Sequence, residues 1–153
     1  LAKITVSDGT TPNSSTTATG VELNTLLAIN VTTSSINYGT LVPGTNTGST
    51  NQVATTTNAG NSSTTLNLSG TALVKGSATI ATSSQHYATS TFTFGGAEQV
   101  LSGTATAVSG FLLTSPTSTT AVAKSTFWGI TVPTGSATGT YSGMNTFTAV
   151  FSP

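Results

Sequence analysis

Hydrophobic and polar residues alternate along much of this chain. Residues 140–151 carry all their aromatic side chains at odd positions, and residues 64–72 hold Leu66 and Leu68 two positions apart. A period of two is that of a strand with one buried face. The sequence therefore predicts β-structure in both segments. The odd-numbered residues of the last segment are Tyr141, Phe147, Ala149 and Phe151.

The stretch 36–73 predicts three strands joined by turns. The strands are expected at 35–39, 52–57 and 64–72. Pro43-Gly44 is a turn signal, because proline presets φ and glycine accepts a positive φ. Residues 58–61, Asn-Ala-Gly-Asn, predict a hairpin turn for the same reason.

The rest of the chain predicts further short strands and turns. Residues 21–31 allow a weak helical spacing, but their flanks are typical of strands and no capping box is clear, so we expect a strand with Glu22 facing outward. About eight to ten strands with frequent turns predict an all-β, antiparallel β-sandwich, with a jelly-roll-like variant left open. The other expected strands are 85–94, 100–108, 111–113, 121–132 and 140–151.

Several turn motifs carry a family resemblance. The sequence INYGTLVPG, followed by NQVATTTNAGNSSTTLNLSGTAL, resembles the immunoglobulin-like modules of bacterial and archaeal surface proteins. Residues 128–150 are similar to the last two strands of such domains. The resemblance covers about two thirds of the chain and consists of turn motifs, so it implies an immunoglobulin-like sandwich more than a function. The matching residues are Tyr38-Gly39, Pro43-Gly44, Asn58, Gly60, Asn61 and Ser69-Gly70-Thr71.

The first twenty residues are expected to be separate from a single sandwich domain at 21–153. Residues 1–6 alternate like a strand, and residues 7–20 contain no large hydrophobe and read as a flexible Thr/Ser-rich linker. A strand of about 20 Å on a linker reaching up to about 46 Å could pair with a neighbouring subunit. We therefore predict donation of this strand to another copy, with the first strand of its own sandwich as the alternative. The predicted donor residues are Leu1, Ala2, Lys3, Ile4, Thr5 and Val6.

Charge is scarce. Only 4 % of the 153 residues are charged, arginine is absent, and Ser and Thr make up roughly 38 % of the chain. So little repulsion favours association between copies, and the lack of basic residues argues against nucleic acid. The sequence contains no run of 18 or more apolar residues, so we predict no membrane-spanning helix. The start at Leu1 rather than Met predicts a secreted, extracellular chain whose signal peptide has been removed.

The residue types that carry chemistry are few. There is no cysteine, His86 is the single histidine, and the three acids lie in unrelated segments. We therefore expect no enzyme and no bound cofactor. A Ca²⁺ site would need several oxygen ligands, of which Asp8 supplies one charge and loop carbonyls could supply others. The three acids are Asp8, Glu22 and Glu98.

Two kinds of surface site remain open. Trp128, with the tyrosines, could stack a sugar, but its apolar strand favours a core position, and one of Phe127 and Trp128 should face outward. Four asparagines begin the N-x-Ser/Thr acceptor sequence for glycosylation, and the two in predicted loops, Asn13 and Asn61, are favoured. The four are Asn13, Asn30, Asn61 and Asn67.

Two functions follow from these features. The first is a structural subunit that assembles with copies of itself into an extracellular filament or pilus-like fibre by donating its N-terminal strand. The alternative is a cell-surface adhesin or carbohydrate-binding module of a larger surface protein.

Overall fold

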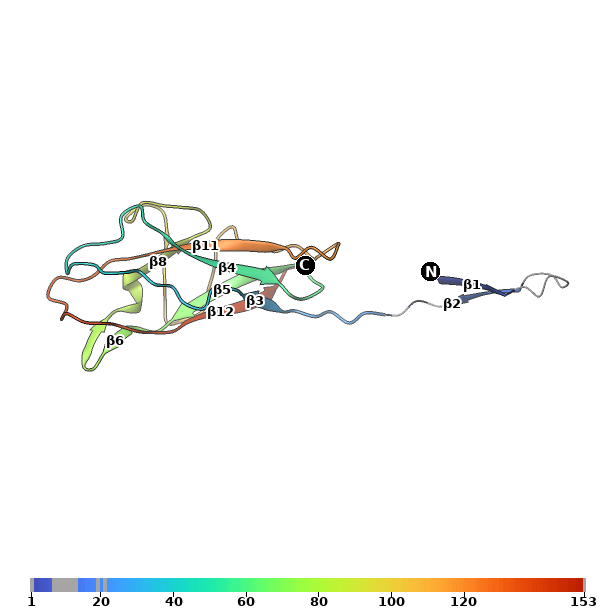
Figure 1. Ribbon diagram of the computed structural model, residues 1–153, viewed down its shortest axis with the longest axis horizontal. Coiled ribbons are helices and arrows are strands. Elements are labelled where there is room, and N and C mark those ends of the chain that lie inside the picture. The colour runs from blue at the N-terminus through green and yellow to red at the C-terminus, as the bar shows by residue number, and fades with distance from the viewer. Residues whose placement is uncertain (1, 7–13, 19, 21, 153) are drawn as a thin grey trace.

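The fold is that of an antiparallel β-sandwich, here a computed structural model that describes the whole chain except residues 1, 7–13, 19, 21 and 153. For residues 2–6 and 14–18 it describes the backbone only. Strands from two open sheets face each other across a hydrophobic interior (Figure 1). The predicted all-β sandwich is confirmed.

The larger sheet has five strands in the order β3-β4-β11-β8-β9. Every neighbouring pair within it is antiparallel. A single 3₁₀ turn, Thr82–Ser84, leads into β8. The strands are β3 (Ile29–Val31), β4 (Gln52–Asn58), β8 (Gln85–Ala88), β9 (Gln99–Val100) and β11 (Ala123–Ile130).

The smaller sheet has three strands in the order β10-β5-β12. A two-stranded hairpin of β6 and β7 extends from the chain after β5. The strands are β5 (Thr64–Gly70), β6 (Leu73–Lys75), β7 (Ala78–Ile80), β10 (Thr106–Ala107) and β12 (Asn145–Phe151).

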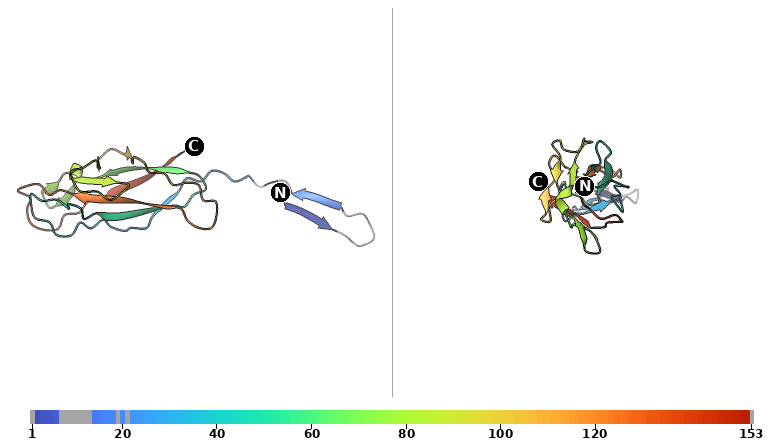
Figure 2. Two further views of the ribbon diagram at one scale, coloured as in Figure 1. Left: turned by 90° about the horizontal axis from the view of Figure 1, so that it is seen from above. Right: turned by 90° about the vertical axis from the view of Figure 1, so that its left-hand side faces the viewer.

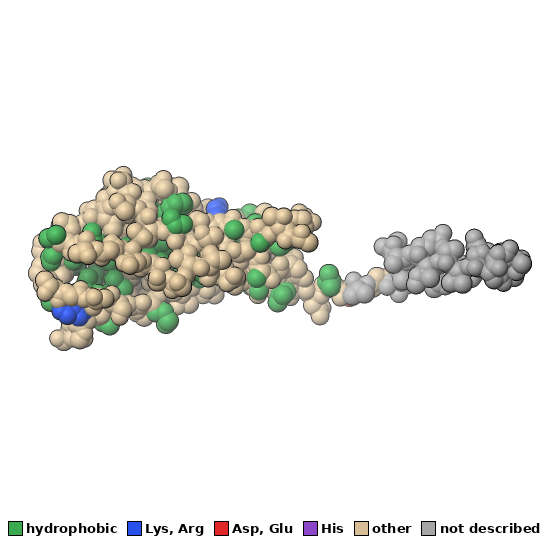
Figure 3. Space-filling model, in the orientation of Figure 1, with side chains coloured by type: hydrophobic (Ala, Val, Ile, Leu, Met, Phe, Trp, Pro, Cys, Tyr) green, Lys and Arg blue, Asp and Glu red, His purple; other side chains and the backbone are tan. Residues whose placement is uncertain are grey.

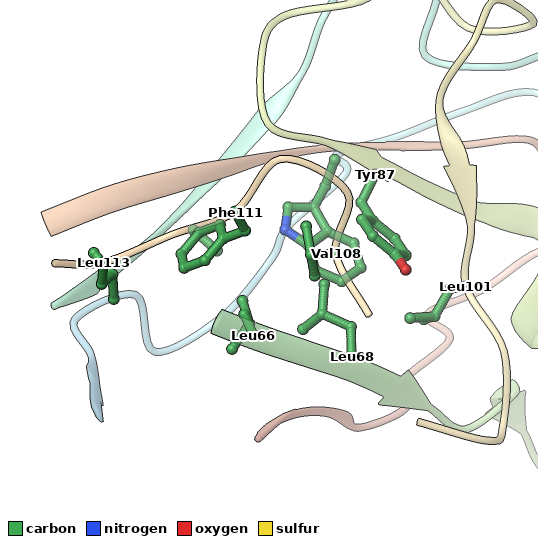
Figure 4. Close-up of a cluster of buried hydrophobic side chains, with 9 residues drawn as sticks. Leu66, Leu68, Tyr87, Leu101, Val108, Phe111 and Leu113 are labelled. Carbon is green, nitrogen blue, oxygen red and sulfur yellow. The ribbon is translucent and has the colours of Figure 1, made fainter. Parts of the chain in front are cut away.

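The core lies between the two sheets. Leu66 and Leu68 of β5 and Trp128 of β11 are fully buried, as their period of two predicts. The Trp128 ring lies 5.4 Å from that of Tyr87. Burial of each such side chain stabilises the fold by about 1.5–3 kcal/mol. Figure 4 shows how the chain between β9 and β11 adds further side chains to this cluster, namely Leu101, Val108, Phe111 and Leu113.

The predicted strand at 35–39 is wrong. Ile36 and Tyr38 do pack against the core, as their alternation suggests. Their backbone, however, pairs with no strand, and the Gly39 N–H instead donates to Oδ1 of Asn37 at 2.9 Å. Such a local bond from asparagine competes with a strand ladder. The turn at Pro43-Gly44 is confirmed, with a φ of 84° at Gly44.

The predicted hairpin at 58–61 is also wrong. Strands β4 and β5, on either side of it, are confirmed but belong to different sheets. The turn therefore crosses from one sheet to the other. Asn58 supports the crossing from inside, because its buried Nδ2 donates to the carbonyls of Ser62 and Thr114.

Other predicted strands are shorter than expected. In the predicted strand 21–31, the described residues 22–31 contain only the strand Ile29–Val31, although Glu22 is exposed as predicted. In the predicted strand 85–94, only the first four residues form a strand, β8. The predicted strand 100–108 is replaced by two short strands near its ends, β9 and β10. Side-chain alternation continues beyond the point where a partner strand ends, which explains these overestimates.

The N-terminal segment forms a sheet of its own. Strand β1 (Ala2–Val6) pairs antiparallel with β2 (Ser14–Ala18), and Ile4 lies opposite Thr16. In the described part of the chain neither strand pairs with the sandwich, and Figures 1 and 2 show the hairpin set apart from it. Leu1 and Asn13 lie outside the described residues.

Candidate functional site

The single histidine forms a hydrogen bond with the carboxylate of Glu98. His86 Nδ1 lies 3.0 Å from Oε1 of Glu98, whose side chain is almost fully buried, and the His86 ring stacks on Phe94 at 4.3 Å. The N–H of Gly95 donates to the same Glu98 oxygen at 2.6 Å. These contacts hold the 89–98 loop against the outer face of β8. Among the described residues, no three His, Cys, Asp or Glu side chains lie close enough together to hold a metal ion.

The pKa of Glu98 reflects opposing causes. Burial would raise it, but backbone hydrogen bonds from Gly95 and Glu98, the hydrogen bond with His86 and the charge of His86 together lower the pKa below its ordinary value. Burial alone raises the pKa of the Tyr38 and Tyr87 hydroxyls. All three shifts belong to structural contacts within the sandwich.

The aromatic residues are placed for packing. Trp128 is 0 % exposed, so it cannot stack on a sugar, and its interpretation as a core residue is confirmed. Phe127 is the neighbour that faces outward, as expected from alternation. Its cross-strand partners on that face are Val53 and Ala88.

The glycosylation sequences lie in unlike environments. Asn30 is exposed on the edge strand β3, whereas Asn67 is half-buried on β5, between β10 and β12. Asn61 is exposed, but its side chain is engaged: Oδ1 accepts from the Leu26 N–H at 2.7 Å and Nδ2 donates to the Asn24 carbonyl at 2.9 Å. Of the three acceptors that the structure describes, Asn30 is thus the one with the fewest contacts to lose on modification.

The sheet edges differ greatly in length. In the five-stranded sheet the edge strands are β3, with three residues, and β9, with two. In the three-stranded sheet one edge is β10, with two residues, and the other is β12, with seven. In the described sandwich, β12 is therefore the one long strand with no hydrogen-bonded neighbour on one side, although β3 of the other sheet approaches it.

The direction of the open backbone groups on β12 follows from the register. The Ser152 N–H donates to the Ser63 carbonyl, and the Val150 carbonyl accepts from the Thr64 and Thr65 hydroxyls, so even-numbered residues bond toward β5. In an antiparallel pair the backbone N–H and C=O groups of successive residues point alternately toward the partner strand and away from it. The N–H and C=O groups of the odd-numbered residues consequently point away from the sheet. These residues are Asn145, Phe147, Ala149 and Phe151.

The interior beneath this edge is incompletely covered. The inward-facing Phe147 and Ala149 remain partly exposed, whereas Leu66 and Leu68, their partners on β5, are 0 % exposed. Phe151, at the strand's end, is 53 % exposed.

Strand β12 lacks the residues that usually prevent an edge strand from pairing with other strands. Asn145–Phe151 contains neither proline nor a charged residue, the two devices that commonly protect an edge. The two lysines whose side chains are described make contacts elsewhere: Lys75 donates to the Thr138 carbonyl and Lys124 to the Gly110 carbonyl. The face drawn in Figure 3 is mostly uncharged and polar, with scattered hydrophobic side chains.

The candidate site is thus a strand edge, which the sequence predicted only as a strand. No family model, curated protein or solved structure matches the chain. Among the described residues no helix is long and apolar enough to cross a membrane.

Proposed function

We propose that this chain is a structural subunit of an extracellular filament or pilus-like fibre, a homopolymer joined by donation of the N-terminal strand. One observation carries the proposal: β1 belongs to neither sheet of the sandwich and pairs only with β2. The immunoglobulin-like character of the module is part of the same proposal, as are its place outside the cell and its lack of enzymatic activity.

The hairpin that holds β1 is a weak competitor. An isolated two-stranded sheet is marginally stable at best in water. Its second strand, Ser-Ser-Thr-Thr-Ala, offers no large hydrophobe to Ile4 or Val6. Transfer of β1 to a sandwich would replace its backbone hydrogen bonds one for one and bury Ile4 and Val6, each worth about 1.5–3 kcal/mol when fully buried.

Strand donation and the low charge of the chain both favour assembly into an open filament. Each copy would give one strand and receive one, which is a heterologous contact and propagates into an open filament. With a formal net charge of zero and 4 % charged residues, copies repel each other little. The two hypotheses of filament and adhesin separate here, because only the first requires the N-terminal strand.

Deletion of residues 1–20 tests the proposal. Electron microscopy of the full chain should show uniform fibres, and the shortened chain should remain dispersed with its sandwich folded, because the deleted strands contribute to neither sandwich sheet. Ile4→Asp should act like the deletion, and Thr5→Ser is its control. Fibres of normal width from the shortened chain would contradict the proposal.

A further inference from the structure

We propose that the open edge of β12 is the acceptor, and that β1 of a second copy adds to it as the next strand of the three-stranded sheet. This inference rests on the proposed filament and names the surface that receives the donated strand. The sheet would then run β10-β5-β12 followed by the incoming β1.

Strand length selects this edge. The donor β1 has five residues, and an acceptor must present at least as many to satisfy its backbone. The edges at β3, β9 and β10 offer three, two and two residues, whereas β12 offers seven. The outward N–H and C=O groups of β12 recur at every second residue, which is the spacing at which an added strand forms its ladder.

The side chains also match. On β12 the inward residues Phe147 and Ala149 are half-covered, and the outward residues Thr146 and Thr148 are exposed. The donor sequence alternates in the same way, with Ala2, Ile4 and Val6 separated by polar residues. Placing the apolar set inward would bring Ile4 beside the exposed flank of Phe147 and leave Lys3 and Thr5 in solvent.

A second copy is the occupant because the chain's own strand is elsewhere. In the single chain β1 pairs with β2, and the edge of β12 stays open. Pairing of β12 with β12 of another copy is the competing arrangement. It would form a closed two-fold dimer rather than a filament.

A single proline substitution on β12 of the full-length chain tests whether its edge is the acceptor. Ala149→Pro removes an N–H that points away from β5, and edge strands tolerate proline at such positions. The sandwich should stay folded, as followed by the fluorescence of the buried Trp128, and fibre formation should fall by at least tenfold. Ala149→Val, which keeps the N–H, is the matched control and should form fibres. Fibres of Ala149→Pro at the control's rate and width would overturn the inference.

Cysteine pairs identify the contact directly, since the natural chain has no cysteine. Full-length Thr5→Cys chains are mixed with Thr148→Cys chains, assembled and oxidised, which tests a β1 parallel to β12 with Ile4 opposite Phe147. Mixing with Thr146→Cys chains tests the antiparallel direction at the same Ile4–Phe147 contact. We expect disulfide-linked pairs of one chain of each kind. A Thr5→Cys, Ser15→Cys double variant reports the β1–β2 hairpin, because these residues are opposite each other.

The outcomes separate this inference from the filament proposal. Fibres in which Thr5→Cys links only to Asn30→Cys on β3 would overturn the β12 acceptor and leave the filament standing. Thr148→Cys chains that link only to each other, in a closed dimer, would overturn both. A full-length chain that stays monomeric at all concentrations would also overturn both.

Discussion

Gly60 lets the backbone of residues 26–28 pack closely against the turn after β4. A Cβ at Gly60 would overlap the Leu26 carbonyl oxygen and lie 2.9 Å from the Ala28 nitrogen, both backbone atoms that cannot swing aside. The φ of Gly60 is ordinary for any residue, so Gly60→Ala acts through this clash alone.

The magnitude follows from the hydrogen bonds beside Gly60. The Asn61 N–H donates to the Leu26 carbonyl at 3.1 Å and the Ala59 N–H donates to the Ala28 carbonyl at 3.0 Å, and both must lengthen. Each contributes about 1 kcal/mol, so we expect the free energy of unfolding to fall by about 2 kcal/mol. Little apolar burial is lost, because Leu26 is 55 % exposed.

Urea unfolding followed by Trp128 fluorescence measures this change. Gly103→Ala is the matched control, because only a carbonyl oxygen at 3.8 Å lies near its added Cβ and its φ is not positive. The control should lie within about 0.5 kcal/mol of the natural chain, as surface substitutions usually do. A Gly60→Ala variant as stable as Gly103→Ala would refute the reasoning.

Three further predictions concern the core and the titrating groups. Leu68→Ala should cost about 2–5 kcal/mol and Leu112→Ala, at a site 46 % exposed, far less, as compared in thermal melts. The raised pKa of Tyr38 means that its stabilising contribution is present below pH 10.0 and is lost as pH rises further, so Tyr38→Phe should flatten the alkaline fall in urea midpoint. Because the pKa of Glu98 is lowered in the folded chain, its ionised carboxylate contributes stability above pH 4.5, and this contribution is lost as pH falls further. Glu98→Gln should therefore flatten the acid side of the same profile. Unchanged profiles in either variant would contradict the assignment.

Side-chain direction was predictable from sequence. The period of two placed Leu66 and Leu68 on one face, and both are fully buried. The same argument required Phe127 and Trp128 to face opposite ways, and they do. These predictions succeed because alternation is a local property of an extended backbone.

Strand pairing was less predictable, because it depends on residues far apart in the chain. Ile36 and Tyr38 alternate and pack inward, yet their backbone has no partner strand. The turn at 58–61 has hairpin residues but joins two sheets. Nothing in residues 145–151 distinguishes an edge strand from a central one, since that depends on what lies on its far side. The open edge could therefore be found only in three dimensions.

The two unusual features of this chain each cost stability while they remain separate. An edge of seven residues without charge or proline leaves its outward backbone groups to water and the flank of Phe147 partly uncovered. A short hairpin outside the sandwich leaves β1 with a partner that lacks large hydrophobes. Natural sheets usually remove the first problem with lysine, proline or a bulge, none of which the described β12 carries. Pairing of β1 with β12 of another copy would remove both at once, and it is the absence of guarding charge that makes this contact accessible.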